Sequence, residues 1–184
     1  KNIEITLYDH ATGEVRYNYV HTPDSRNQPD TLFLNPIGKY DIVVHTFPIV
    51  KLNDIELTPG KHNIIGIDVP LGNLIISEGQ STSFSPKQCV VRDNKTGEIV
   101  YAQNFNTKER YIAGVYDIDI LTIPRLHYED YVIKGGVDNK INIPLPGTLN
   151  NSTTENKVYS IYLVKEKKKK KVYESSLNAS NEMV

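Results

Sequence analysis

Acidic side chains gather in one stretch of the chain, where they could act on a substrate or bind a cation. Asp117 and Asp119 are separated by a single residue, and Glu129 and Asp130 follow. Paired carboxylates serve acid–base catalysis, and carboxylate oxygens are ligands that Ca²⁺ prefers. The alternative is a solvated sheet face. We favour it, because the positions of a second, similar segment that match Asp119 and Glu129 are not acidic.

Neither the histidines nor the cysteine indicates a metal site. No two histidines have a spacing typical of zinc ligands. The histidines are His10, His21, His45, His62 and His127. The single cysteine, Cys89, lies in an apolar run and is interpreted as a small buried side chain. Nucleophile elbows, phosphate-binding loops and dinucleotide fingerprints do not occur in the sequence, so we predict no catalytic residue, no cofactor and no enzymatic activity.

The segment KEKKKKK, residues 165–171, is the strongest charge feature. It contributes +5 to a net charge of −1, which leaves −6 for the remaining residues. A nucleic-acid partner is not expected, because such proteins carry a basic face across the fold. Two interpretations stay open: a solvated hairpin tip, or weak contact with a polyanion. The residues of that possible contact are Lys167, Lys168, Lys169, Lys170 and Lys171.

The elements that position these residues come from an internal repeat. Residues 37–67 align without gaps with residues 113–143, and 11 of 31 positions are identical. Upstream, residues 7–17 match residues 91–101, with extra residues of the first copy in the polar segment 21–36. Repeats of this kind predict a duplicated structural unit.

A third, partial copy follows, because residues 160–178 align with residues 88–106. This alignment places the lysine run on the turn Asp-Asn-Lys-Thr-Gly-Glu of the second copy. The predicted organisation is therefore repeat 1 over 1–70, repeat 2 over 71–146 and partial repeat 3 over 147–184, a hairpin with a lysine-rich tip.

Apolar residues alternate with polar ones in each copy, which indicates strands. Tyr40, Ile42 and Val44 illustrate the pattern, and it is expected to continue through Ile65 and Ile67. Segments 58–61 and 134–137 carry hairpin signals, as do 10–14 and 94–98. Apolar stretches are too short for a transmembrane segment. The sequence therefore predicts an all-β chain of small antiparallel β-sandwiches, two copies and a partial third.

The order of these motifs resembles a known family. An apolar strand, Asp-x-x-Thr-Gly-Glu, a loop and Gly-x-Tyr-Asp-Ile recur in both copies. This order is similar to prealbumin-like or carboxypeptidase-regulatory-like β-sandwich repeats, found in tandem after von Willebrand factor A domains in secreted bacterial proteins. The resemblance implies a non-catalytic module that is secreted, periplasmic or on the cell surface.

The expected function is to space or present another domain, such as a von Willebrand factor A domain, and to contact protein partners or an adjacent domain. The alternative is a carbohydrate-binding accessory module, because exposed tyrosines could stack on sugars. The chain has 12 tyrosines for such stacking and no tryptophan. A glycan is the second possible partner.

Overall fold

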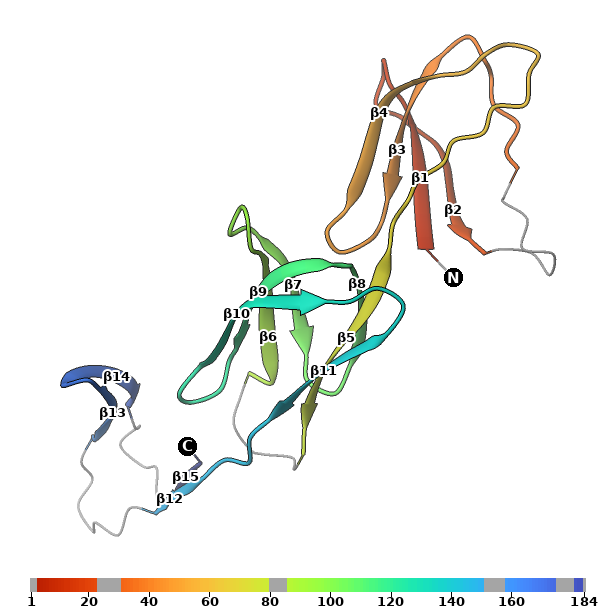
Figure 1. The fold of residues 1–184 in the computed structure, drawn as a ribbon. Coiled ribbons are helices and arrows are strands. Elements are labelled where there is room, and N and C mark those ends of the chain that lie inside the picture. Colours follow the sequence, from red (N-terminus) through yellow and green to blue (C-terminus); the bar gives the residue numbers. More distant parts are fainter. Residues whose placement is uncertain (1–2, 23–30, 80–85, 151–157, 175–180, 184) are drawn as a thin grey trace. The chain divides into compact units, whose positions relative to one another are not determined.

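The computed structural model describes residues 3–22, 31–79, 86–150, 158–174 and 181–183, and these residues form strands, turns and loops without helices (Figure 1). The predicted all-β class is confirmed. Two compact units divide the chain: Lys1–Leu71 with Arg110–Ile112, and Gly72–Glu109 with Ala113–Val184. Each unit is described by itself.

The first unit contains one four-stranded antiparallel sheet in the order β2-β1-β3-β4. Its strands are β1 (Ile3–Asp9), β2 (Val15–His21), β3 (Lys39–Val44) and β4 (Val50–Glu56). Leu7, Ile42 and Val44 are buried on one face of this sheet, where leucines 32 and 34 pack against them. The alternation predicted from the sequence therefore directs one face to the core.

The second unit contains an equivalent sheet and a further one. The first has the order β10-β9-β6-β7, from β6 (Gln88–Asp93), β7 (Ile99–Asn104), β9 (Gly114–Ile120) and β10 (Leu126–Ile133). The other has the order β11-β5-β8, from β5 (Leu71–Glu78), β8 (Lys108–Ile112) and β11 (Asp138–Ile143), of which Leu71 and Arg110–Ile112 group with the first unit. Leu74 and Ile76 of β5 are fully buried. Buried Gln103 of β7 donates from Nε2 to the Leu74 carbonyl at 3.0 Å, which joins the two sheets.

The four-stranded sheets share their register. Leu7 faces Ile42 across β1 and β3, and the aligned residues Val91 and Ile118 face each other across β6 and β9. The β1–β2 ladder has a bulge after Leu7, and the β6–β7 ladder has one after Val91. Backbone geometry thus matches at the positions that the sequence alignment pairs.

The turns of the two units match as well. Asp9 accepts backbone N–H bonds from Ala11 and Thr12, and Asp93 accepts the same bonds from the two residues that follow Asn94. Gly13 and Gly97 have φ of 71° and 72°, a conformation that glycine adopts at little cost. The Thr-Gly turns therefore have the form that the sequence predicts.

One predicted strand of the first unit is irregular in the structure. Residues 62–67 were expected to be a strand and are irregular, whereas the aligned residues 138–143 form β11. The signals at 58–61 and 134–137 do form turns, but β10 and β11 belong to different sheets and make no hairpin. The physical reason is partnership: β11 pairs with β5, and the described part of the first unit has no strand beside 62–67.

The C-terminal region contains a hairpin, β13 (Ser160–Lys165) and β14 (Lys168–Glu174), and a short pair, β12 (Thr148–Asn150) and β15 (Asn181–Met183). The hairpin turn consists of Glu166 and Lys167, both with positive φ. Of the other lysines of the run, Lys165 ends β13, and Lys168 to Lys171 lie on β14 rather than at the tip.

In the part of the chain that the structure describes, no helix has the length and apolar character needed to span a membrane.

Candidate functional site

The first unit holds an open apolar groove of about 890 Å³. Its floor is the buried face of the four-stranded sheet, with Ile5, Leu7 and Val44. One wall comes from residues 31–36, and the other comes from residues 57–69. Both walls are irregular segments, so their backbone groups are not committed to a sheet ladder.

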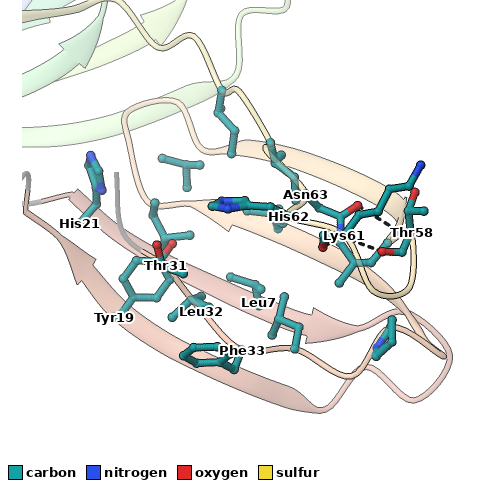
Figure 2. Close-up of a pocket in the computed structure, with 18 of the residues that line it drawn as sticks. Leu7, Tyr19, His21, Thr31, Leu32, Phe33, Thr58, Lys61, His62 and Asn63 are labelled. Atoms are coloured by element: carbon teal, nitrogen blue, oxygen red, sulfur yellow. Dashed lines mark hydrogen bonds between the residues drawn. The ribbon is translucent and has the colours of Figure 1, made fainter. Parts of the chain in front are cut away.

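Polar groups lie toward the ends of the groove. Figure 2 shows Thr58 and Lys61 at one end and His21 at the other, with Leu7 and Leu32 between them. Asn63 organises the turn at the first end: its Oδ1 accepts from the Thr58 amide at 2.9 Å, and its Nδ2 donates to the carbonyls of Thr58 and Lys61, each at 3.1 Å.

The aligned residue in the second unit, Asn139, makes the same turn and one more bond. Its Oδ1 accepts from the Lys134 amide at 3.0 Å, and its Nδ2 donates to the carbonyls of Lys134 and Val137. The same Nδ2 also donates to the Asn73 carbonyl of β5 at 3.0 Å. Asn139 therefore holds the central strand of its sheet, whereas the bonds of Asn63 stay within its own turn.

One wall of the groove corresponds to a neighbour of β5. By the alignment, residues 62–67 match β11, whereas residues 31–36 belong to the segment with the extra residues of the first copy. In the second unit β11 pairs with β5. The groove therefore lies beside the segment whose counterpart is paired with β5.

Aligned residues of 62–67 and β11 also differ in burial. Ile141 of β11 is 4% exposed, whereas its counterpart Ile65 is 37% exposed. Asn139 is 8% exposed, and Asn63 is exposed to solvent. The first unit thus presents to solvent the side chains that its counterpart covers with a strand.

The acidic residues singled out in the sequence act mainly in turn geometry. Asp117 Oδ1 accepts from the Asp130 amide at 3.0 Å, where Asp130 has a positive φ, and Asp41 accepts in the same way from Asp54 at 2.8 Å. The Asn94 side chain and then the Asp130 amide lower the pKa of Asp117. For Asp41, the Asp54 amide and then His10 lower the pKa.

Asp119 is joined to a histidine rather than to a second carboxylate. His127 Nδ1 lies 2.7 Å from Asp119 Oδ1, and its Nε2 lies 3.4 Å from Glu129 Oε1. All three side chains are at least partly exposed. Among the described residues, no group of three or more histidine, cysteine, aspartate or glutamate side chains could hold a metal ion.

The other histidines have separate surroundings. His10 Nδ1 lies 2.8 Å from Asp41 Oδ1, and His45 Nε2 lies 2.8 Å from Thr6 Oγ1. His21 and His62 line the groove. The structure therefore brings two of the five histidines to the candidate site, at positions that the sequence did not distinguish.

Cys89 is fully buried on β6, as the sequence predicts. Burial raises the pKa of its thiol to about 11, so the nucleophilic thiolate is scarce near neutral pH. This cysteine is a packing residue of the second unit.

The lysines of the possible polyanion contact do not share one surface. Lys167 lies in the turn, and Lys168 to Lys171 follow one another on β14, where successive side chains point to opposite faces. Lys171 Nζ also bonds Glu174 at 2.9 Å. Positive charge is therefore divided between the two faces of the hairpin.

Sequence reasoning missed the groove. Its signal was present: residues 65–69 keep the apolar alternation of a strand, and Asn63 aligns with Asn139. These features predict a strand, but they do not reveal whether another strand lies beside it.

Comparison of the chain with family models, with curated proteins and with solved structures found no match in any of the three.

Proposed function

We propose that the chain is a non-catalytic structural and interaction module, with the prealbumin-like character that its motifs suggest. In this role it spaces or presents another domain of a secreted or cell-envelope protein and contacts protein partners. The observation that carries the proposal is the groove of the first unit. An apolar concavity of this size on a small domain is typical of an interaction site.

The surroundings of the titratable groups support the same role. Asp41 and Asp117 hold backbone amides in matching turns, and Cys89 is enclosed in a core. Such groups stabilise a scaffold. A rigid scaffold with loops and open sheet edges suits protein–protein contact.

A photo-crosslinking residue in place of Ile65 tests this function in the cells that produce the protein. We expect protein adducts from this position, because it faces the groove, and few from Glu56 carrying the same group on β4. Glycan-array binding that a single Tyr→Ala change abolishes would instead support the carbohydrate module. Hydrolase activity of the purified chain would overturn both non-catalytic functions.

A further inference from the structure

We propose that the hairpin of the C-terminal region binds a flexible acidic polysaccharide through its lysine arm, residues 162–171. The arm is the part of the β13–β14 ladder (blue in Figure 1) that continues past its bulge, and it carries six lysines and one glutamate. This inference goes beyond the proposed function, because it concerns neither the groove nor a protein partner.

The arm is longer than the matching part of the other two hairpins. Each ladder has a bulge directly after an apolar residue that lies opposite a tyrosine. These pairs are Leu7 with Tyr17, Val91 with Tyr101 and Ile161 with Tyr173. Past the bulge, the β1–β2 and β6–β7 ladders each contain one further pair, whereas the β13–β14 ladder contains four. None of the residues in these further pairs is buried in any of the three hairpins, so the lysines lie on an exposed extension.

The residue types of the arm are not those that stabilise a hairpin. The turn residues Glu166 and Lys167 have φ of 49° and 66°, and turns of this kind prefer asparagine and glycine. Lys165 and Lys168 lie directly opposite each other, where like charges destabilise a ladder. Lysines on edge strands also prevent unwanted strand pairing, but that role does not explain a lysine in the turn. A bound anion relieves the repulsion between these side chains.

Positive charge is concentrated in the arm. The arm carries +5, and the remaining residues of the chain sum to −6. Lys171 Nζ lies 2.9 Å from Glu174 Oε2, and the other lysines of the arm form no ion pair with the residues that the structure describes. An acidic ligand can therefore bind them without displacing a carboxylate of the protein, and it is directed to this part of the chain.

The presence of lysines on both faces of the arm favours a flexible ligand over a flat one. Cross-strand partners share a face, so Lys169 lies on one face with Val164, and Lys170 lies on the other face with Leu163. A bilayer surface or a rigid duplex contacts one of these faces at a time. A flexible polyanion can pass around the arm and place acidic groups beside both faces.

The exposed apolar side chains of the arm indicate a ligand made of sugars. Three successive cross-strand pairs each consist of an apolar residue and a lysine: Tyr162 with Lys171, Leu163 with Lys170 and Val164 with Lys169. The three apolar residues are 51%, 44% and 60% exposed. Cross-strand side chains lie about 5 Å apart, so each pair presents an apolar patch beside a cation. An acidic sugar unit has the complementary groups, a ring with an apolar face and a sulfate or carboxylate.

The test measures binding of a fluorescent heparin octasaccharide to the whole chain by fluorescence anisotropy. Heparin is the probe because it is a flexible chain of sulfated sugars. We expect saturable binding at about 50 mM salt that weakens by about tenfold or more at about 200 mM salt, because several charged contacts form together. Changes in NMR chemical shift on binding should be largest within residues 160–174.

Two triple variants of equal net charge give the test its specificity. Lys168–Lys170→Gln, in the arm, should weaken heparin binding by about tenfold or more, because three cationic contacts are lost. The same replacement at Lys95, Lys134 and Lys140, which are exposed in the second unit, should change binding by less than about twofold. Lys168–Lys170→Arg keeps the charge of the arm and should bind within about threefold of the natural chain.

Three further comparisons separate an acidic polysaccharide from other ligands. Polyphosphate of equal charge has no sugar ring and should bind at least about threefold more weakly than heparin. Vesicles that contain phosphatidylglycerol should also bind more weakly, because a flat surface does not contact both faces of the arm. Tyr162→Ala should weaken heparin binding by about threefold without abolishing it, since the lysines remain.

Equal losses in the two glutamine variants would overturn the proposal, because net charge alone would then govern binding. Polyphosphate or vesicles that bind as tightly as heparin would overturn it in favour of another polyanion. Complete loss of binding in Tyr162→Ala would overturn it in favour of a site for neutral sugars. Absence of heparin binding would also overturn it but would leave the proposed protein contacts of the first unit, which the crosslinks from Ile65 test separately.

Discussion

The two units share a four-stranded sheet in order and register, and they differ in what covers it. In the second unit β5, β8 and β11 close the apolar face, and Ile76 and Ile118 are fully buried. In the first unit irregular walls flank a groove of about 890 Å³ over the same face. The difference teaches that a segment with the alternation of a strand, residues 62–67, stays irregular where no strand lies beside it, whereas its counterpart β11 pairs with β5.

The comparison also shows which features depend on that strand. The aspartate-capped turns and the positive φ of Asp54 and Asp130 occur in both units, because they use contacts within the four-stranded sheet. Burial of the residue pair Ile65 and Ile141 differs, because those side chains need the other sheet. Local contacts therefore persist where the longer-range contact is missing.

Thiol reactivity should show the largest difference. Cys89 aligns with Ile5, which lines the groove. In a Cys89→Ala background, Ile5→Cys should react with a maleimide about a hundredfold faster or more than Cys89 does in the natural chain. Cys89 is enclosed, and its pKa is raised to about 11. Similar rates, measured by mass spectrometry at pH 7, would show that the groove is closed in solution.

Truncation of the aligned isoleucines should show the next largest difference. Ile141→Ala removes a buried side chain and should destabilise the second unit by about 2–5 kcal/mol. Ile65→Ala should change the first unit by less than about 1 kcal/mol, because Ile65 is already exposed. Urea-dependent hydrogen exchange reads each unit separately. An equal cost in the two units would contradict the difference in burial.

The aligned asparagines should differ by less. Asn139→Ala removes the donor of the part-buried hydrogen bonds to the Asn73 and Lys134 carbonyls, and a loss of about 1–3 kcal/mol is expected. For Asn63→Ala water can replace the side chain, so the loss should stay near 0.5 kcal/mol. The same exchange experiment measures both variants. A larger loss of stability for Asn63→Ala than for Asn139→Ala would contradict the expected order.

Acid dependence should be the smallest effect and should be similar in the two units. The pKa values of Asp41 and Asp117 are lowered in the folded chain from 3.8, so each contributes stability that is present above pH 3.8. That contribution is lost as the pH falls through the lower, folded pKa. Asp117→Asn should therefore reduce Tm more at pH 6 than at pH 2. A Tm difference that grows on acidification would have the wrong sign.

Much of the fold could be predicted from the sequence. Alternation of Tyr40, Ile42 and Val44 predicted an inward face, and Thr-Gly-Glu predicted both glycine turns. Gapless similarity between 37–67 and 113–143 predicted equivalent positions, and Cys89 was predicted to be buried. These features depend on the alternation of apolar and polar residues, on the residue types in the turns and on the apolar character of single side chains. All three are properties of the local sequence.

The tertiary structure decided the rest. Residues 62–67 and 138–143 both have the alternation of a strand, but only residues 138–143 pair with another strand, β5. A strand is defined by backbone hydrogen bonds to a neighbouring segment. Most lysines of the run lie on β14 rather than at a tip, because the turn closes over two residues. The groove likewise depends on which segments lie beside the sheet. A local sequence pattern does not contain this information, because the segments are distant along the chain.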